Sequence, residues 1–122
     1  MKLHRQVLTA TLVAALGPGW IRVGEREYRE NVVLTPDAVV PGWAPAGFAA
    51  LTSTDFAGLL EHAPEVVLLG TGVGQRFPDP RLTGCLAEAG IGVDIMDTRA
   101  ACRTFNILIA EDRRVVAALL IE

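Results

Sequence analysis

The chain has 122 residues, of which 51% are hydrophobic and 20% are charged, so it is long and apolar enough for one globular domain with a substantial core. Its net charge of −3 gives no reason to expect binding to nucleic acid or to an anionic membrane surface. Two cysteines without a CxxC motif or metal-ligand spacing argue against a disulfide framework and fit a reducing compartment.

The N-terminal third predicts a β-meander. Threonines alternate with apolar residues in "LTATLV", and glycines mark the turns that follow. The expected strands are residues 7–15, 20–23 and 27–34, with turns at 17–19 and 24–25. The basic, apolar start resembles a short signal peptide, but the Thr9–Thr11 alternation favours a strand that is kept in the mature protein. No run reaches the ~18 apolar residues that a transmembrane helix needs.

A loop and a helix are expected next. Residues 35–47 contain three prolines and two glycines and are typical of a crossing loop, with room for a short strand at 38–40. A helix should begin after a cap at Ser53 or Thr54 and end before Pro64. Its expected apolar face consists of Phe56, Leu59 and Leu60.

The second half alternates strands with helices. The expected elements are strand 65–70, helix 80–90, strand 91–96, helix 98–112 and strand 113–122. The strands are apolar on both faces, which indicates a sheet that is covered on both sides. The connection from strand 65–70 to strand 91–96 should be a parallel, right-handed crossover.

A glycine-rich turn follows the strand 65–70. Gly70, Gly72 and Gly74 would permit positive φ angles and the close approach of a ligand. A dinucleotide-binding fingerprint would need glycine where Gln75 stands, with a helix starting there, so the match is partial. The alternative is a turn that only reverses the chain. No GKT or GKS sequence is present, so a P-loop is absent.

A second polar turn opens the helix 98–112. Asp97 or Thr98 should cap this helix. Arg99, Arg103 and Asn106 fall on one face at spacings of four and three, and cations in a first turn oppose the helix dipole. Something negative should offset them. It is either a local carboxylate, such as Asp97, Asp79 or Glu111, or an anionic ligand.

The two turns follow the carboxyl ends of strands that should be parallel neighbours, where open α/β sheets bind ligands. The candidate ligand-binding residues are therefore Gly70, Thr71, Gly72, Asp97, Thr98, Arg99, Arg103 and Asn106. No catalytic residue, metal site or cofactor is predicted. His4 and His62 lie near no expected nucleophile, and Cys102 falls on the apolar stripe of its helix, where it should be buried.

The blocks "EVVLLGTGVGQRFP" and "GIGVDIMDTRAACRTFNILIAEDRRVVAALL" resemble a small-domain family of unknown function that is widespread in bacteria. The family includes a mitochondrial assembly factor of respiratory complex I, assembly factor 3, and an adipogenesis-associated animal protein. "IRVGEREYRENVVLTP" fits the family's early hairpin, so the resemblance covers most of the chain. It implies a three-layer α/β fold, in which helices flank a mixed five-stranded central sheet and an N-terminal β-hairpin adds a layer. It carries over no catalytic residue.

We therefore expect residues 1–122 to form one cytoplasmic domain that is non-catalytic and binds a protein partner, with subunits of a respiratory complex as candidates. The alternative is a domain that binds a small anion or acts as an enzyme at the two turns. An exposed apolar patch would favour the first hypothesis, and a concave polar cleft would favour the second.

Overall fold

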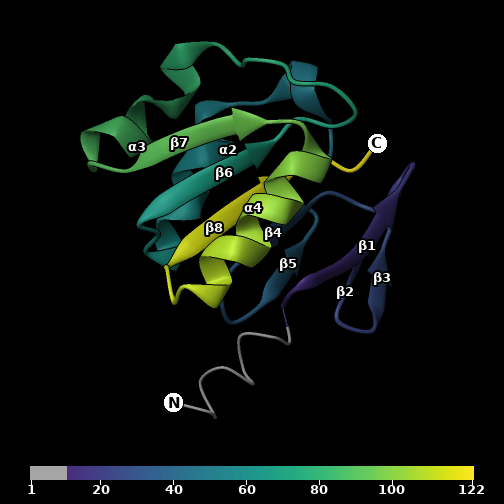
Figure 1. The fold of residues 1–122 in the computed structure, drawn as a ribbon. Helices are drawn as coiled ribbons and strands as arrows, with labels where there is room; N and C mark the ends of the chain where they lie inside the picture. The colour runs from purple at the N-terminus through teal and green to yellow at the C-terminus, as the bar shows by residue number, and fades with distance from the viewer. Residues whose placement is uncertain (1–10) are drawn as a thin grey trace.

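The computed structural model describes residues 11–122 and contains two β-sheets, with helices on both faces of the larger one (Figure 1). The strands are β1 (Val13–Gly17), β2 (Trp20–Val23), β3 (Arg26–Tyr28), β4 (Val32–Leu34), β5 (Val39–Pro41), β6 (Val66–Gly70), β7 (Gly92–Met96) and β8 (Val115–Leu119). The α-helices are α2 (Ser53–Ala57), α3 (Gly84–Glu88) and α4 (Thr98–Ala110), and the 3₁₀ helices are η1 (Phe48–Ala50), η2 (Gly58–His62) and η3 (Pro80–Thr83).

The central sheet is mixed and has the strand order β5-β4-β8-β6-β7. The strand β6 runs parallel to both of its neighbours, β7 and β8, whereas β4 is antiparallel to β8 and β5. The predicted parallel pairing of the strands around 65–70 and 91–96 is therefore confirmed. In Figure 1, α4 lies in front of this sheet and α2 lies behind it.

Side-chain alternation divides the core into two clusters, one on each face of the central sheet. On β8, Val115, Ala117 and Leu119 join the cluster under α4, while Val116 and Ala118 join the cluster under α2 and α3. The strands lacked a polar face in the sequence because both of their faces are covered.

The N-terminal layer is a three-stranded antiparallel sheet, β1-β2-β3, that packs on the same side as α4. Ile21 and Val23 of β2 point into the core and are almost completely buried. Asn106 of α4 joins the layers, since its amide accepts from the Val13 N–H at 2.9 Å and donates to the Val13 carbonyl at 3.0 Å. The three-layer α/β fold with an added N-terminal β-layer is thus confirmed.

Several predicted boundaries in the first half are wrong. The first strand begins at Val13 and continues to Gly17, and residues 7–10 of the predicted strand lie outside the described residues. The predicted strand 27–34 is two strands, β3 and β4, in different sheets. The short strand in the crossing loop is present, as β5.

The first helix also differs from the prediction in detail. Its cap is Thr52, whose hydroxyl accepts from the Asp55 N–H while the Asp55 carboxylate accepts from the Thr52 N–H, a capping box. The helix changes from α to 3₁₀ at Gly58, which turns Leu60 to the surface while Phe56 and Leu59 stay buried. The predicted helix 80–90 is likewise a 3₁₀ turn followed by the short α3.

Within residues 11–122, no helix is long and apolar enough to cross a membrane.

Candidate functional site

The two polar turns of the sequence lie side by side at the carboxyl ends of β6 and β7. Gly70 is paired with Met96 in the parallel register, and the Thr71 N–H donates to the Met96 carbonyl at 2.9 Å. The Thr98 N–H donates to the Gly72 carbonyl at 2.9 Å, so the first residue of α4 is joined to the glycine-rich turn. The predicted proximity of the two turns is therefore confirmed.

The two glycines that flank Thr71 are required by close packing. A Cβ atom at Gly70 would lie 2.9 Å from the Leu119 side chain and 3.0 Å from Thr98 Cα, because α4 begins directly against this residue. Gly72 has a φ of +96°, and a Cβ there would collide with the Glu122 carboxylate and approach the Arg76 guanidinium. The turn therefore has a structural reason for both glycines without any ligand.

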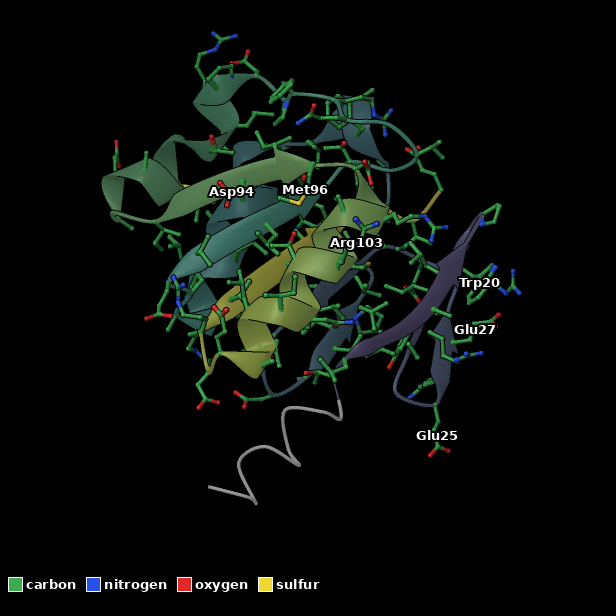
Figure 2. All side chains as sticks on the ribbon, viewed as in Figure 1. Trp20, Glu25, Glu27, Asp94, Met96 and Arg103 are labelled. Atoms are coloured by element: carbon green, nitrogen blue, oxygen red, sulfur yellow. The ribbon has the colours of Figure 1, made fainter. Side chains whose placement is uncertain are left out.

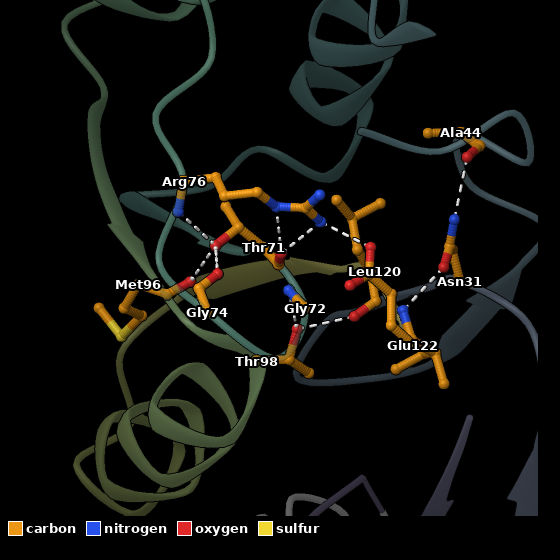
Figure 3. A network of polar contacts seen from close by, with 11 residues as sticks. Asn31, Ala44, Thr71, Gly72, Gly74, Arg76, Met96, Thr98, Leu120 and Glu122 are labelled. Atoms are coloured by element: carbon orange, nitrogen blue, oxygen red, sulfur yellow. Dashed lines mark hydrogen bonds and ion pairs between the residues drawn. The ribbon is translucent and has the colours of Figure 1, made fainter. Parts of the chain in front are cut away.

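Thr98 is buried. Both hydrogen-bonding roles of its hydroxyl are used, as Figure 3 shows. The hydroxyl accepts from the Gly72 N–H at 2.8 Å and donates to the Leu120 carbonyl at 2.7 Å. This side chain connects the glycine-rich turn, α4 and the segment that follows β8.

Thr71 is also buried and holds the rest of the loop (Figure 3). Its hydroxyl donates to the Gly74 carbonyl at 2.7 Å and accepts from the Arg76 N–H at 3.0 Å. The Arg76 guanidinium in turn donates two hydrogen bonds to the Thr71 carbonyl, from Nε at 3.1 Å and from Nη2 at 2.7 Å.

Arg76 is one of the residues of this region that sequence reasoning missed. Its guanidinium forms an ion pair with Glu122 at 2.5 Å and stacks over the Phe48 ring, with Cζ 4.4 Å from the ring centroid. The partners lie far away in the sequence, and only the glycine-rich surroundings of Arg76 could have drawn attention to it. Arg76 fixes the loop 71–79 against two distant parts of the chain.

The helix cap is confirmed as Asp97, whose carboxylate accepts from the Ala100 N–H at 2.8 Å. Of the four predicted residues at the start of α4, Thr98 and Arg99 line the same cavity, and Asp97 and Arg103 are not among its lining residues. Arg99 is exposed and faces the glycine-rich turn across a cavity, whereas Arg103 is exposed one turn further along α4 and lies outside that cavity. Figure 2 shows Arg103 on the outer side of α4.

Two sequence-based interpretations of this region are wrong. Asn106 does not face the turns, because its amide is used by the backbone of β1. Asp79 does not neutralise Arg99 or Arg103, since it pairs with Arg81 at 2.6 Å and caps η3. The side-chain hydrogen bond from Arg81 lowers the pKa of Asp79 to about 2.

The cavity has a volume of about 210 Å³ and lies between the β1–β2 hairpin, the glycine-rich turn and the start of α4. We call it the hairpin cavity, and its walls include Leu16, Pro18, Trp20, Val73, Arg99 and Glu122. Gly72 and Thr98 of the predicted set also line it, but their polar groups are engaged in the hydrogen bonds above. Arg99 makes no hydrogen bond or ion pair within residues 11–122, so its guanidinium is a charged group in these walls with free donors.

Cys102 is buried, as predicted, with 2% of its surface exposed. Burial raises the pKa of its thiol to about 12, and the nearby Arg99 opposes this shift only in part. A thiol with a raised pKa is a poor nucleophile. Among residues 11–122, no group of three or more His, Cys, Asp or Glu residues could hold a metal ion.

The loop 71–79 exposes two large apolar side chains. Val73 is 84% exposed and Phe77 is 68% exposed, the highest values among the exposed large hydrophobic side chains of residues 11–122. The loop that carries them is held by Thr71, Arg76 and Glu122, so these side chains are presented on a fixed backbone.

Residues 13–120 match the model of the family described as protein of unknown function (DUF498/DUF598). The chain belongs to this family. It is 33% identical over 104 residues to the Bos taurus protein named NADH dehydrogenase [ubiquinone] 1 alpha subcomplex assembly factor 3, which covers 84% of the chain and 55% of the relative.

It is also 40% identical over 57 residues to a Francisella tularensis protein named 13 kDa major membrane protein, with 47% of the chain and 46% of the relative covered. The chain thus spans about half the length of these curated relatives. A crystal structure from Bordetella parapertussis superposes with a TM-score of 0.84 at 39% identity and covers 91% of the chain and 95% of that protein.

Proposed function

We propose that this chain is a non-catalytic protein-binding domain of the cytoplasm that assists the assembly of a respiratory complex. The observation that carries the proposal is the pair of exposed side chains, Val73 and Phe77, on the loop 71–79. The free energy falls when a partner covers a hydrophobic side chain that was exposed to water. A loop that is already ordered loses little conformational entropy on binding.

The polar chemistry of the region supports binding rather than catalysis. The buried hydroxyls of Thr71 and Thr98 are occupied by backbone partners, and no buried side-chain N or O atom in residues 11–122 lacks a hydrogen bond. A catalytic group usually needs a free polar atom and a pKa near the working pH. The buried thiol, Cys102, has its pKa moved in the opposite direction.

The name of a relative supports the proposed class of partner. A relative that matches 84% of the chain is named for the assembly of NADH dehydrogenase, so subunits or assembly intermediates of such a complex are the proposed partners.

The test is complementation in a bacterium that makes this respiratory complex and carries the gene. Deleting the gene should lower the amount of assembled complex on a native gel, and the wild-type chain should restore it. Phe77→Asp should fail to restore it although the folded chain accumulates, because the charge would be buried against the partner. Ile107→Asp, at a position 54% exposed on α4, is the matched control and should restore assembly. Full rescue by Phe77→Asp, or normal assembly without the gene, would contradict the proposal.

A small-anion site remains the second candidate, and Arg99 is the observation that favours it. This guanidinium lines the hairpin cavity beside the first turn of α4. Millimolar phosphate, sulfate or acetate should then raise the melting temperature of the wild type but not of Arg99→Ala. No stabilisation of the wild type would count against such a site.

A further inference from the structure

We propose that the hairpin cavity is the docking point for an acidic, apolar segment of the partner polypeptide, which inserts a large apolar side chain between Trp20 and Val73 and places an adjacent Asp or Glu against Arg99. This inference rests on the proposed protein-binding function and adds the chemistry of the segment that is recognised.

The shape of the cavity favours an apolar side chain. Leu16, Pro18 and Trp20 come from the hairpin, and Val73 comes from the opposite wall. The indole of Trp20 lies against Gly17, its cross-strand neighbour, where a Cβ atom would come within 2.5 Å of Nε1. Because Gly17 has no side chain, the Trp20 ring can pack directly against the backbone of the neighbouring strand. A volume of about 210 Å³ accommodates one large side chain rather than a folded domain.

Hydrogen bonds also fix the backbone of both walls of the cavity. The Gly19 N–H of the hairpin turn donates to the Glu122 carbonyl at 2.8 Å, which ties the hairpin to the segment after β8. On the other wall, Thr98 holds Gly72. An incoming side chain would therefore meet a preformed space, which reduces the cost of binding.

The charge at the cavity favours an acidic neighbour. The Glu122 side chain is already paired with Arg76, whereas Arg99 forms no ion pair within residues 11–122. Arg103 adds a second exposed cation one helical turn away. The whole chain carries a net charge of −3, so a preference for acidic peptides would have to come from this local pair.

The experiment is a selection of random twelve-residue peptides displayed on phage against the folded chain and against Arg99→Glu. This substitution should leave the fold intact, since the residue is exposed and a carboxylate is favourable in the first turn of a helix. The wild type should enrich peptides that place Asp or Glu beside Leu, Ile, Phe or Trp. The Arg99→Glu selection should lose the acidic residue and gain Lys or Arg at that place.

The best wild-type peptide is then synthesised and its affinity is measured by the fluorescence of the tryptophans. Arg99→Glu should weaken it by about tenfold or more, the effect of reversing one charge at an interface. Arg26→Glu, at the start of β3, changes the net charge by the same amount as Arg99→Glu. It should change the affinity by less than about twofold. Nuclear magnetic resonance shifts should centre on Leu16, Trp20, Val73 and Arg99.

Failure to enrich any peptide, a consensus without acidic residues, or an unchanged consensus with Arg99→Glu would overturn the inference. So would a peptide that binds elsewhere. If only free small carboxylates or phosphate bind at Arg99, the cavity is an anion site and not a docking point. These results leave the Phe77→Asp complementation unaffected, so the two proposals can fail separately.

Discussion

Replacing Gly72 by alanine should destabilise the chain through the backbone and through one ion pair. The φ of +96° is unfavourable for an L-residue by about 1–2 kcal/mol. The new methyl group would also displace the Glu122 carboxylate from Arg76. That pair is about 40% exposed on each side, so its loss adds no more than about 1 kcal/mol. We therefore expect Gly72→Ala to lower the free energy of unfolding by about 1–3 kcal/mol.

Urea denaturation, followed by circular dichroism and tryptophan fluorescence, measures this change. Gly74→Ala is the matched control, because Gly74 has no positive φ and a Cβ there meets open space. Its effect should stay within about 0.5 kcal/mol. Because Gly72→Ala already disturbs Glu122, adding Glu122→Ala should cost less than the sum of the two single changes. Equal stabilities of Gly72→Ala and Gly74→Ala, or full additivity with Glu122→Ala, would refute this reasoning.

Three further predictions concern single side chains. Thr98→Val should lower the free energy of unfolding by about 2–4 kcal/mol, since it leaves the Gly72 N–H and the Leu120 carbonyl unpaired. Thr98→Ser keeps the hydroxyl and should lower it by less than half as much in the same urea titration. Asn106→Ala should speed amide hydrogen exchange in β1 at least tenfold, whereas Ile107→Ala should leave it unchanged. Equal exchange rates of β1 in the two variants would contradict a bridging role of Asn106. Cys102 should resist thiol reagents at pH 8 until the chain unfolds, and rapid labelling of the folded chain would disprove this. The free energy of unfolding should fall as the pH rises from about 9 to about 12, because the thiol ionises at a lower pH in the unfolded chain than in the folded one.

Local patterns predicted the central sheet and α4 well. Strands such as β6 and β8 are apolar on both faces, and Asp97 is a strong capping residue directly before a helical periodicity, so each signal lies within a few residues. The same locality explains the error over 27–34. The chain leaves one sheet after Tyr28 and enters another at Val32, and only tertiary packing decides where the first sheet ends.

The candidate site was predicted less completely, because its contacts are distant in the sequence. The pairing of Arg76 with Glu122 and the bonds from Asn106 to Val13 join segments that no local pattern relates. Helical spacing placed Arg99, Arg103 and Asn106 on one face, but it could not show that β1 would occupy part of that face. The glycine-rich turn could be a ligand site or a turn that only reverses the chain, and local sequence could not show that Gly70 and Gly72 make room for Thr98 and Glu122.

The most direct test of the proposed function is site-specific photo-crosslinking in living cells. A benzoylphenylalanine introduced in place of Phe77, which is 68% exposed, should crosslink the chain to a subunit or assembly intermediate of the respiratory complex, as identified by mass spectrometry. The same group in place of Ile107, which is 54% exposed on α4, should give no such product. The loop 71–79 would not be the binding surface if position 77 gave no crosslink, or if positions 77 and 107 gave the same products.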